Sequence, residues 1–180
     1  GMAHIGANQS NVPIEMIEAE YPIRIERYGI EADTGGPGKY RGGLSLVRDY
    51  RVLAADAELN VRSDKRAHPP HGLAGGRSGA PSMSILSETG ANDRVLPVLL
   101  TEPIPVKQGA LFHHAMAGAG GYGDPLERDS DAVLWDVIEE KVSISHAAEA
   151  YGVVVEPGNP PTLDEAATSR LRTQMRAAAE

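Results

Sequence analysis

The chain has 180 residues and a formal net charge of −8 at pH 7, and 41% of its residues are hydrophobic. This length suits one domain that buries a core without metal or disulfide staples. The absence of cysteine excludes disulfides, thiolate zinc sites and cysteine nucleophiles, and it fits the reducing cytoplasm, where we expect the protein. The acidic balance argues against a nucleic-acid partner, and no apolar run reaches the length of a membrane span.

Residues 1–20 form a polar lead followed by a short predicted helix. Asn11 is placed to cap that helix, and Glu15 and Glu18, three residues apart, would share one of its faces. Two interpretations of these carboxylates stay open. They are either a solvated face near a helix N-terminus or a pair of catalytic residues for acid/base chemistry.

Residues 21–125 carry short β-like segments separated by glycine and proline turns. Alternating apolar residues predict a first strand over Tyr21–Ile30, with a bulge at Arg27 and Tyr28. Five more strands are expected over residues 44–53, 57–62, 83–86, 94–100 and 111–116. With one Phe and one Trp available, their core has to be aliphatic. Short strands of this kind predict a mainly β fold, either a sandwich or a partly closed barrel.

Three glycine-rich loops connect these strands, at Thr34–Gly43, Gly72–Gly79 and Gly118–Pro125. The first holds five glycines and a proline in ten residues, a composition that favours tight turns and close backbone approach over helix or central strand. The third matches the letters of the dinucleotide fingerprint. It is followed by Asp-Pro rather than by a helix N-terminus, so we expect a structural turn. Because no phosphate-binding P-loop motif is present either, this segment is not expected to bind ATP or another cofactor.

A C-terminal helical segment is predicted over residues 126–180. Its helices should begin at Asp129 or Ser130, run from Ser143 to a stop at Gly152, and begin again at a capping box formed by Thr162 and Glu165.

The loops carry the residues that we consider for substrate binding. Arg41, Lys65 and Arg66 are suited to hold a carboxylate or a phosphorylated group, and salt bridges between the loops are the competing interpretation. His68 and His71 sit on a stiff Pro-Pro turn and could form a metal site with Asp64 or Asp124 if the loops converge. Their spacing matches no metal motif, so we expect loop histidines and no metal ligands. His113 and His114 should point to opposite faces of one strand.

Several ordered blocks resemble the hydantoinase B family, which includes B-type subunits of hydantoinases and acetone carboxylases and the matching half of 5-oxoprolinases. The blocks are Asn11-Val-Pro-Ile-Glu15 with Glu18, Tyr21–Tyr28, Gly35–Gly43, Pro69–Gly76, Gly118–Pro125, Asp136-Val, Val142-Ser with Ala147, and Tyr151–Val154. The resemblance runs from about His4 to Val155 and concerns the C-terminal portion of much longer subunits.

The resemblance implies a hydrolase that opens a cyclic amide with ATP, or carboxylation of a ketone, by a complex in which this segment is inactive alone. The implied partners are an actin-like A-type subunit, which would use ATP to phosphorylate the substrate, and the remainder of the B subunit. ATP and a divalent metal are expected for the full complex, and we expect an oligomer. Anion contacts would fall to Arg41, Lys65, Arg66 and Asp124, while Glu15 and Glu18 are candidates for acid/base roles. The alternatives are a non-catalytic assembly domain and, third, a stand-alone domain that binds metal through His68 and His71.

Overall fold

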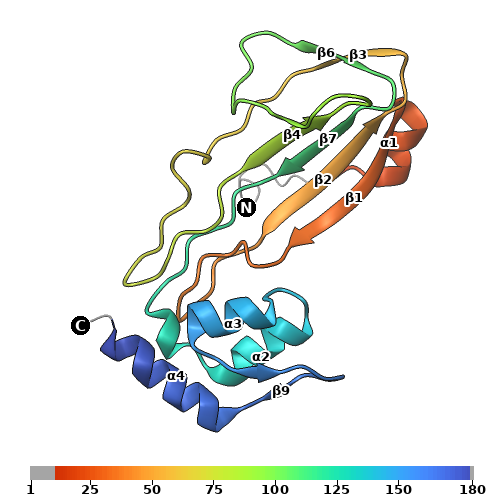
Figure 1. Ribbon diagram of the computed structural model, residues 1–180. Helices are drawn as coiled ribbons and strands as arrows, with labels where there is room; N and C mark the ends of the chain where they lie inside the picture. The colour runs from red at the N-terminus through yellow and green to blue at the C-terminus, as the bar shows by residue number, and fades with distance from the viewer. Residues whose placement is uncertain (1–10, 179–180) are drawn as a thin grey trace.

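The computed structural model describes residues 11–178 of the chain. Its centre is a five-stranded antiparallel sheet in the order β1-β2-β7-β4-β5, with helices α2, α3 and α4 gathered beyond one end and α1 beside the other (Figure 1). The sheet strands are β1 (Ile23–Glu31), β2 (Ser45–Val52), β4 (Met83–Ser87), β5 (Arg94–Val95) and β7 (Leu111–Ala115). The polar lead expected before residue 11 lies outside the described residues.

The edge strand β1 bends where the sequence predicts it. Its register against β2 shifts between Ile25 and Arg27, one residue before the predicted bulge. Helix α1 (Ile14–Glu20) packs beside this strand, and Glu18 accepts a hydrogen bond from the backbone N–H of Ile25 at 2.8 Å. An edge strand leaves backbone groups without a strand partner, so this carboxylate satisfies one donor of the exposed edge.

A two-stranded ribbon, β3 (Asp56–Leu59) paired with β6 (Ile104–Lys107), packs over part of one sheet face. The core between ribbon and sheet is aliphatic, as predicted; its buried members are Val52, Val61, Leu86, Leu96, Val106 and Ala110. A β-rich body with C-terminal helices is therefore confirmed. A sandwich is not confirmed, because the second layer is a short ribbon, and the described residues form no closed barrel. Strand β6 was not expected, because Pro105 interrupts its alternation.

Three glycine-rich loops lie against one another between the sheet and helices α2–α4 (Figure 1). We call residues 34–43, 69–80 and 117–125 the glycine-loop core. Each loop is hydrogen-bonded through its backbone to the other two: Tyr40 and Tyr122 exchange N–H···O bonds of 2.9 Å, Gly121 N–H donates to Arg77 O at 2.9 Å, and Arg77 N–H donates to Pro37 O at 2.7 Å. The expected turns thus form one interlocked unit rather than three separate loops.

Close backbone contact explains why glycine is needed in this core. A Cβ built on Gly42 would lie 2.0 Å from the carbonyl oxygen of Ala119, and one on Gly118 would lie 1.9 Å from that of Thr34. Real Cβ atoms do not approach this closely, so a side chain at either position would force the loops apart.

The C-terminal part has its own buried cluster of small and medium side chains around Tyr151. Its helices are α2 (Ser130–Ile138), α3 (Ile144–Tyr151) and α4 (Glu165–Ala177), preceded by the 3-10 turn η2 (Pro125–Glu127) and joined by a small ribbon of β8 (Val155–Glu156) and β9 (Thr162–Leu163). The buried members are Val133, Val142, Ala147, Ala150, Tyr151, Val153 and Val155. The boundaries at residues 20, 125 and 180 given to the three segments stay predictions.

Helix capping follows the sequence at two helices and departs from it at two others. The side chains of Asp129 and Ser143 cap α2 and α3 as expected, and Gly152 ends α3 at φ 62°. Helix α4 is capped by Asp164, whose carboxylate accepts from Ala167 N–H at 2.8 Å, so the predicted cap at Thr162 is wrong. An aspartate two residues further on competes successfully because Thr162 is already engaged in β9.

Helix α1 also lacks the predicted cap. Its N-cap position is Pro13, which makes no side-chain cap hydrogen bond, and Asn11 instead donates to the Tyr28 hydroxyl at 2.6 Å. The Asn11 side chain is drawn away because Arg48, beside Tyr28, donates to its Oδ1 at 2.8 Å.

Candidate functional site

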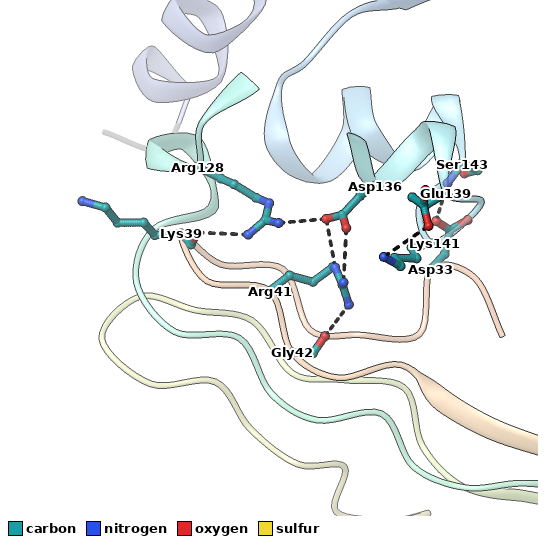
Figure 2. A network of polar contacts seen from close by, with 9 residues as sticks. All are labelled: Asp33, Lys39, Arg41, Gly42, Arg128, Asp136, Glu139, Lys141 and Ser143. Atoms are coloured by element: carbon teal, nitrogen blue, oxygen red, sulfur yellow. Dashed lines mark hydrogen bonds and ion pairs between the residues drawn. The ribbon is translucent and has the colours of Figure 1, made fainter. Parts of the chain in front are cut away.

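A buried carboxylate connects the glycine-loop core to the helices. Asp136, on α2 and only 4% exposed, receives two hydrogen bonds from the Arg41 guanidinium, Nε to Oδ2 at 3.0 Å and Nη2 to Oδ1 at 3.2 Å. Arg128 Nη2 donates to the same Oδ2 at 2.8 Å, and both arginines also reach loop carbonyl groups (Figure 2). Fork-shaped pairing of this kind fixes both position and orientation.

This network gives Arg41 a partner within the chain. Its side chain is 16% exposed, and its remaining nitrogen, Nη1, donates to Gly42 O at 2.7 Å. Arg41 therefore joins the first glycine loop to α2. This resembles the expected salt bridges between loops, except that the partner of Arg41 lies on a helix. Contact between Arg41 and a substrate stays a prediction. The sequence did not point to Asp136 and Arg128 as a charge pair. The signal that could have found them is the acidic Asp136 within the apolar stripe of α2, because a buried carboxylate needs a charged partner.

The other predicted cations lie together at a separate hollow. Segment 63–68 lines a hollow of about 550 Å³ against Pro97 and Val98, and we call it the basic hollow. Lys65 and His68 are exposed at its rim, and Arg66 is half-buried. The Arg66 guanidinium donates to the carbonyl groups of Ser82, at 3.1 Å, and of Leu96. The structure thus brings three of the predicted residues, Lys65, Arg66 and His68, to one site.

Segment 63–66 is held in a strained shape around Ser82. The buried Ser82 donates through its backbone N–H to Lys65 O at 3.3 Å, and its hydroxyl lies 3.1 Å from that of Ser63. Lys65 has φ 60°, a left-handed conformation that residues with a Cβ adopt at a cost. Asp33, Ala74 and Glu140 share this conformation, so it does not single out Lys65, and a role for the Lys65 ammonium in the hollow stays a prediction.

The remaining predicted residues lie elsewhere. Asp124 caps η2, its Oδ1 accepting from Leu126 N–H at 2.9 Å, and His71 is exposed in the second glycine loop. Glu15 is exposed on α1, beside the end of β1 that is remote from the C-terminal helices (Figure 1). Within residues 11–178, no group of three or more His, Asp or Glu residues is arranged to hold a metal ion. Catalytic roles for Glu15 and Glu18 stay predictions.

The paired histidines of β7 behave as the strand geometry predicts, with each ring on its own side of the sheet. His113 Nδ1 lies 2.6 Å from Asp49 Oδ1, and His114 Nδ1 lies 3.1 Å from the Ser84 hydroxyl. The Asp49–His113 pair was not anticipated, because nothing in the sequence sets the register that places β2 opposite β7.

Burial governs the ionisation of the aromatic residue next to the Asp136 network. Burial of Tyr151 raises the pKa of its hydroxyl to about 12, an effect opposed by the positive charges of Arg128 and Arg41. Its ring is fully buried, and Arg128 lies over it at 6.0 Å. Tyr151 is therefore a neutral packing residue near pH 7 and not a base.

No helix formed by residues 11–178 is long and apolar enough to cross a bilayer.

The fold and its loops define a β-rich domain built around interlocked glycine segments, and comparisons with known proteins place that domain in a family. The family model for hydantoinase B/oxoprolinase matches residues 1–125. The chain therefore belongs to the hydantoinase B/oxoprolinase family, as the sequence motifs predicted.

One curated relative is the B subunit of a putative D-/L-hydantoinase from Pseudomonas sp., which is 32% identical over 167 residues covering 92% of this chain. The chain spans only 28% of the length of that relative. Two solved structures share the fold. The ATP-dependent caprolactamase from Pseudomonas jessenii superposes with a TM-score of 0.78 and 33% identity, covering 89% of this chain and 28% of that one. A nucleotide-free acetone carboxylase superposes with a TM-score of 0.82 and 25% sequence identity, covering 93% of this chain and 26% of that one.

Proposed function

We propose that this chain forms the C-terminal part of a B-type subunit in an ATP-dependent enzyme that opens cyclic amides. The observation that carries the proposal is the likeness to the ATP-dependent caprolactamase, at 33% identity and a TM-score of 0.78 over 89% of the chain. The hydantoinase relative supports the same substrate class, because hydantoins and lactams are both cyclic amides.

Within that enzyme the basic hollow forms one wall of an anion-binding site. Lys65 and His68 are exposed there beside the carboxylate of Asp64, whereas the Arg66 guanidinium turns inward to two carbonyl groups and stiffens the backbone, so the site presents the Lys65 ammonium and the His68 ring. A phosphorylated substrate intermediate or a carboxylate product is the ligand these groups suit. ATP and a divalent metal belong to the assembled complex, and the A-type subunit and the remainder of the B subunit are the partners.

A second function, assembly without catalysis, is favoured by the use of Arg41 in the ion pair with Asp136. It is also favoured by three large side chains that the glycine-loop core leaves exposed, Tyr40 at 64%, Leu73 at 59% and Tyr122 at 55%. Exposed aromatic residues on a rigid surface are typical of protein interfaces.

The test is an activity screen of the assembled complex containing this chain, with hydantoins, lactams, oxoproline and small ketones as substrates. We expect ring opening of a cyclic amide that depends on ATP. Carboxylation of a ketone without amide opening, or amide opening that proceeds equally without ATP, would contradict the proposal.

A further inference from the structure

A second hollow lies on the sheet face beneath the β3–β6 ribbon. Its volume is about 320 Å³, and its lining is mostly apolar. Ala57 and Leu59 of the ribbon form its roof, and Tyr50, Leu86 and Phe112 of the sheet form its floor, with His114 at one side. We call it the apolar hollow. Its size is in the range of small-molecule sites, which combine apolar walls with a few polar groups.

The floor of this hollow is a row of rings. Tyr50 on β2 is the register partner of Phe112 on β7, and their rings stack with centroids 6.1 Å apart at 24°. Phe112 stacks in turn on His114, two residues along the same face, at 6.1 Å and 18°. The three rings form a stiff, mostly apolar row along the floor, and a compact ligand that is itself mostly apolar fits against it.

The one nitrogen-bearing ring in the row has a defined hydrogen-bonding state. Ser84 is fully buried, and its hydroxyl lies 3.1 Å from His114 Nδ1, its only side-chain partner among residues 11–178. A buried hydroxyl proton needs an acceptor, so we assign the Ser84 O–H as the donor and Nδ1 as the acceptor. The proton of the neutral imidazole then sits on Nε2, which makes no hydrogen bond to any residue in the described part of the chain.

Charge also decides what this ring can hold. Burial lowers the pKa of His114, and the nearby charges of His113, Arg66 and Arg48 lower it further. Near pH 7 the ring is therefore neutral, and the only acidic residue that lines the hollow is Glu58, which is exposed on β3. Apart from the exposed Glu58 the lining holds no charged residue, so an ion held against the apolar walls would be unpaired and would pay a large desolvation cost.

We propose that the apolar hollow binds a small neutral ring compound whose carbonyl oxygen accepts a hydrogen bond from His114 Nε2. The inference rests on the proposed function and names its substrate class: an unopened lactam or similar cyclic amide fits, whereas the ring-opened amino acid, with its charged ends, is excluded. The hollow would thus retain substrate and release product.

The inference is tested by NMR titration of this 180-residue chain with 2-piperidone, a six-membered lactam, and separately with 5-aminopentanoate, its ring-opened form. We expect saturable shifts of resonances from Phe112, Leu86 and Ala57 with the lactam and none with the amino acid. The variant His114→Asn keeps a donor or acceptor near Ser84 but removes Nε2, and it should weaken lactam binding about fivefold to tenfold, the usual effect of losing one neutral hydrogen bond.

His113→Asn is the matched control, since His113 lies on the opposite face of the same strand, and it should bind the lactam as the wild type does. Ala57→Leu fills the hollow with an apolar group and should abolish binding even if His114→Asn folds poorly. Shifts confined to other regions, equal binding of both compounds, or unchanged affinity in both His114→Asn and Ala57→Leu would overturn the inference.

The outcomes separate this inference from the proposed function. ATP-dependent lactam opening by the complex, together with no lactam binding by the chain, would remove the hollow as a substrate site and leave the function standing. Lactam binding in the hollow without any ATP-dependent amide opening by the complex would keep the hollow as a lactam-binding site and remove the proposed function.

Discussion

Arg41 Nε and Asp136 Oδ2 lie 3.0 Å apart although 95 positions separate them in the chain. This contact joins the first glycine loop to helix α2, and Arg128 completes it from the other side. The side chains are 16% and 6% exposed, so the pair is partly desolvated. Removing one member of such a pair leaves the other charge uncompensated, which costs far more than the pair itself contributes.

We therefore expect Asp136→Asn to lower the free energy of unfolding by about 3 kcal/mol, because two mostly buried guanidinium groups lose their counter-charge. Urea denaturation measures this loss. The control is Arg27→Ala, which breaks an exposed ion pair with Glu31 and should change stability by less than about 1 kcal/mol. Equal effects of the two substitutions would show that the Asp136 network does not hold the loops to the helices.

The glycine-loop core predicts a sharp difference between two glycine substitutions. Gly42→Ala should unfold the protein or lower its stability by about 3 kcal/mol or more, since its Cβ would collide with the backbone of Ala119. Gly29→Ala should change stability by less than about 1 kcal/mol, because a Cβ at Gly29 in strand β1 meets nothing within 4 Å. Thermal unfolding of both variants provides the comparison, and a stable Gly42→Ala variant would contradict the interlocked loops.

Tyr151 provides a prediction with an optical readout. Tyr151 should ionise well above the ordinary tyrosine value of 10 in a spectrophotometric titration, because burial raises the pKa of its hydroxyl to about 12. Its hydroxyl has no hydrogen-bond partner among the described residues, so Tyr151→Phe should leave stability within about 1 kcal/mol of the wild type or raise it. A large loss in Tyr151→Phe would mean that the hydroxyl has a partner.

His114 makes stability depend on pH. Its pKa is lowered in the folded protein by burial and nearby positive charge, so below the ordinary value of 6.5 the unfolded chain binds more protons than the folded one. The contribution of neutral His114 to the free energy of unfolding is fully present above pH 6.5. It is lost as the pH falls through the lower pKa that His114 has in the folded protein. The difference in unfolding free energy between wild type and His114→Asn should therefore shrink between about pH 7.5 and about pH 5. A constant difference would contradict burial of the ring.

Local chemistry decides which elements were predictable from sequence. Strands β1, β2, β4 and β7 lie within two residues of the predicted ranges, because alternating apolar residues and flanking turn residues mark them clearly. The predicted strand over residues 94–100 shortens to Arg94–Val95, since Pro97 has no N–H to continue pairing.

The site depends instead on register and on loop packing, which leave no local signal. Arg41 was singled out as a cation, but its partner Asp136 is set by how the glycine loops meet α2. Lys65, Arg66 and His68 lie at one hollow because they are close in sequence, whereas the sequence pattern suggested one group of Lys65 and Arg66 with Arg41 and another of His68 with His71. The row of Tyr50, Phe112 and His114 follows from the β2–β7 register and could not be inferred from spacing.

The central claim is that the basic hollow serves the chemistry of an ATP-dependent cyclic-amide-opening complex, and Lys65 tests it most directly. Lys65→Gly removes the ammonium while relaxing the strained φ of 60°, so folding and co-purification with the A-type subunit should be preserved. We predict that kcat for ATP-dependent amide opening by the assembled complex falls about tenfold or more. A kcat equal to that of the wild type, in a complex that assembles normally, would contradict the claim.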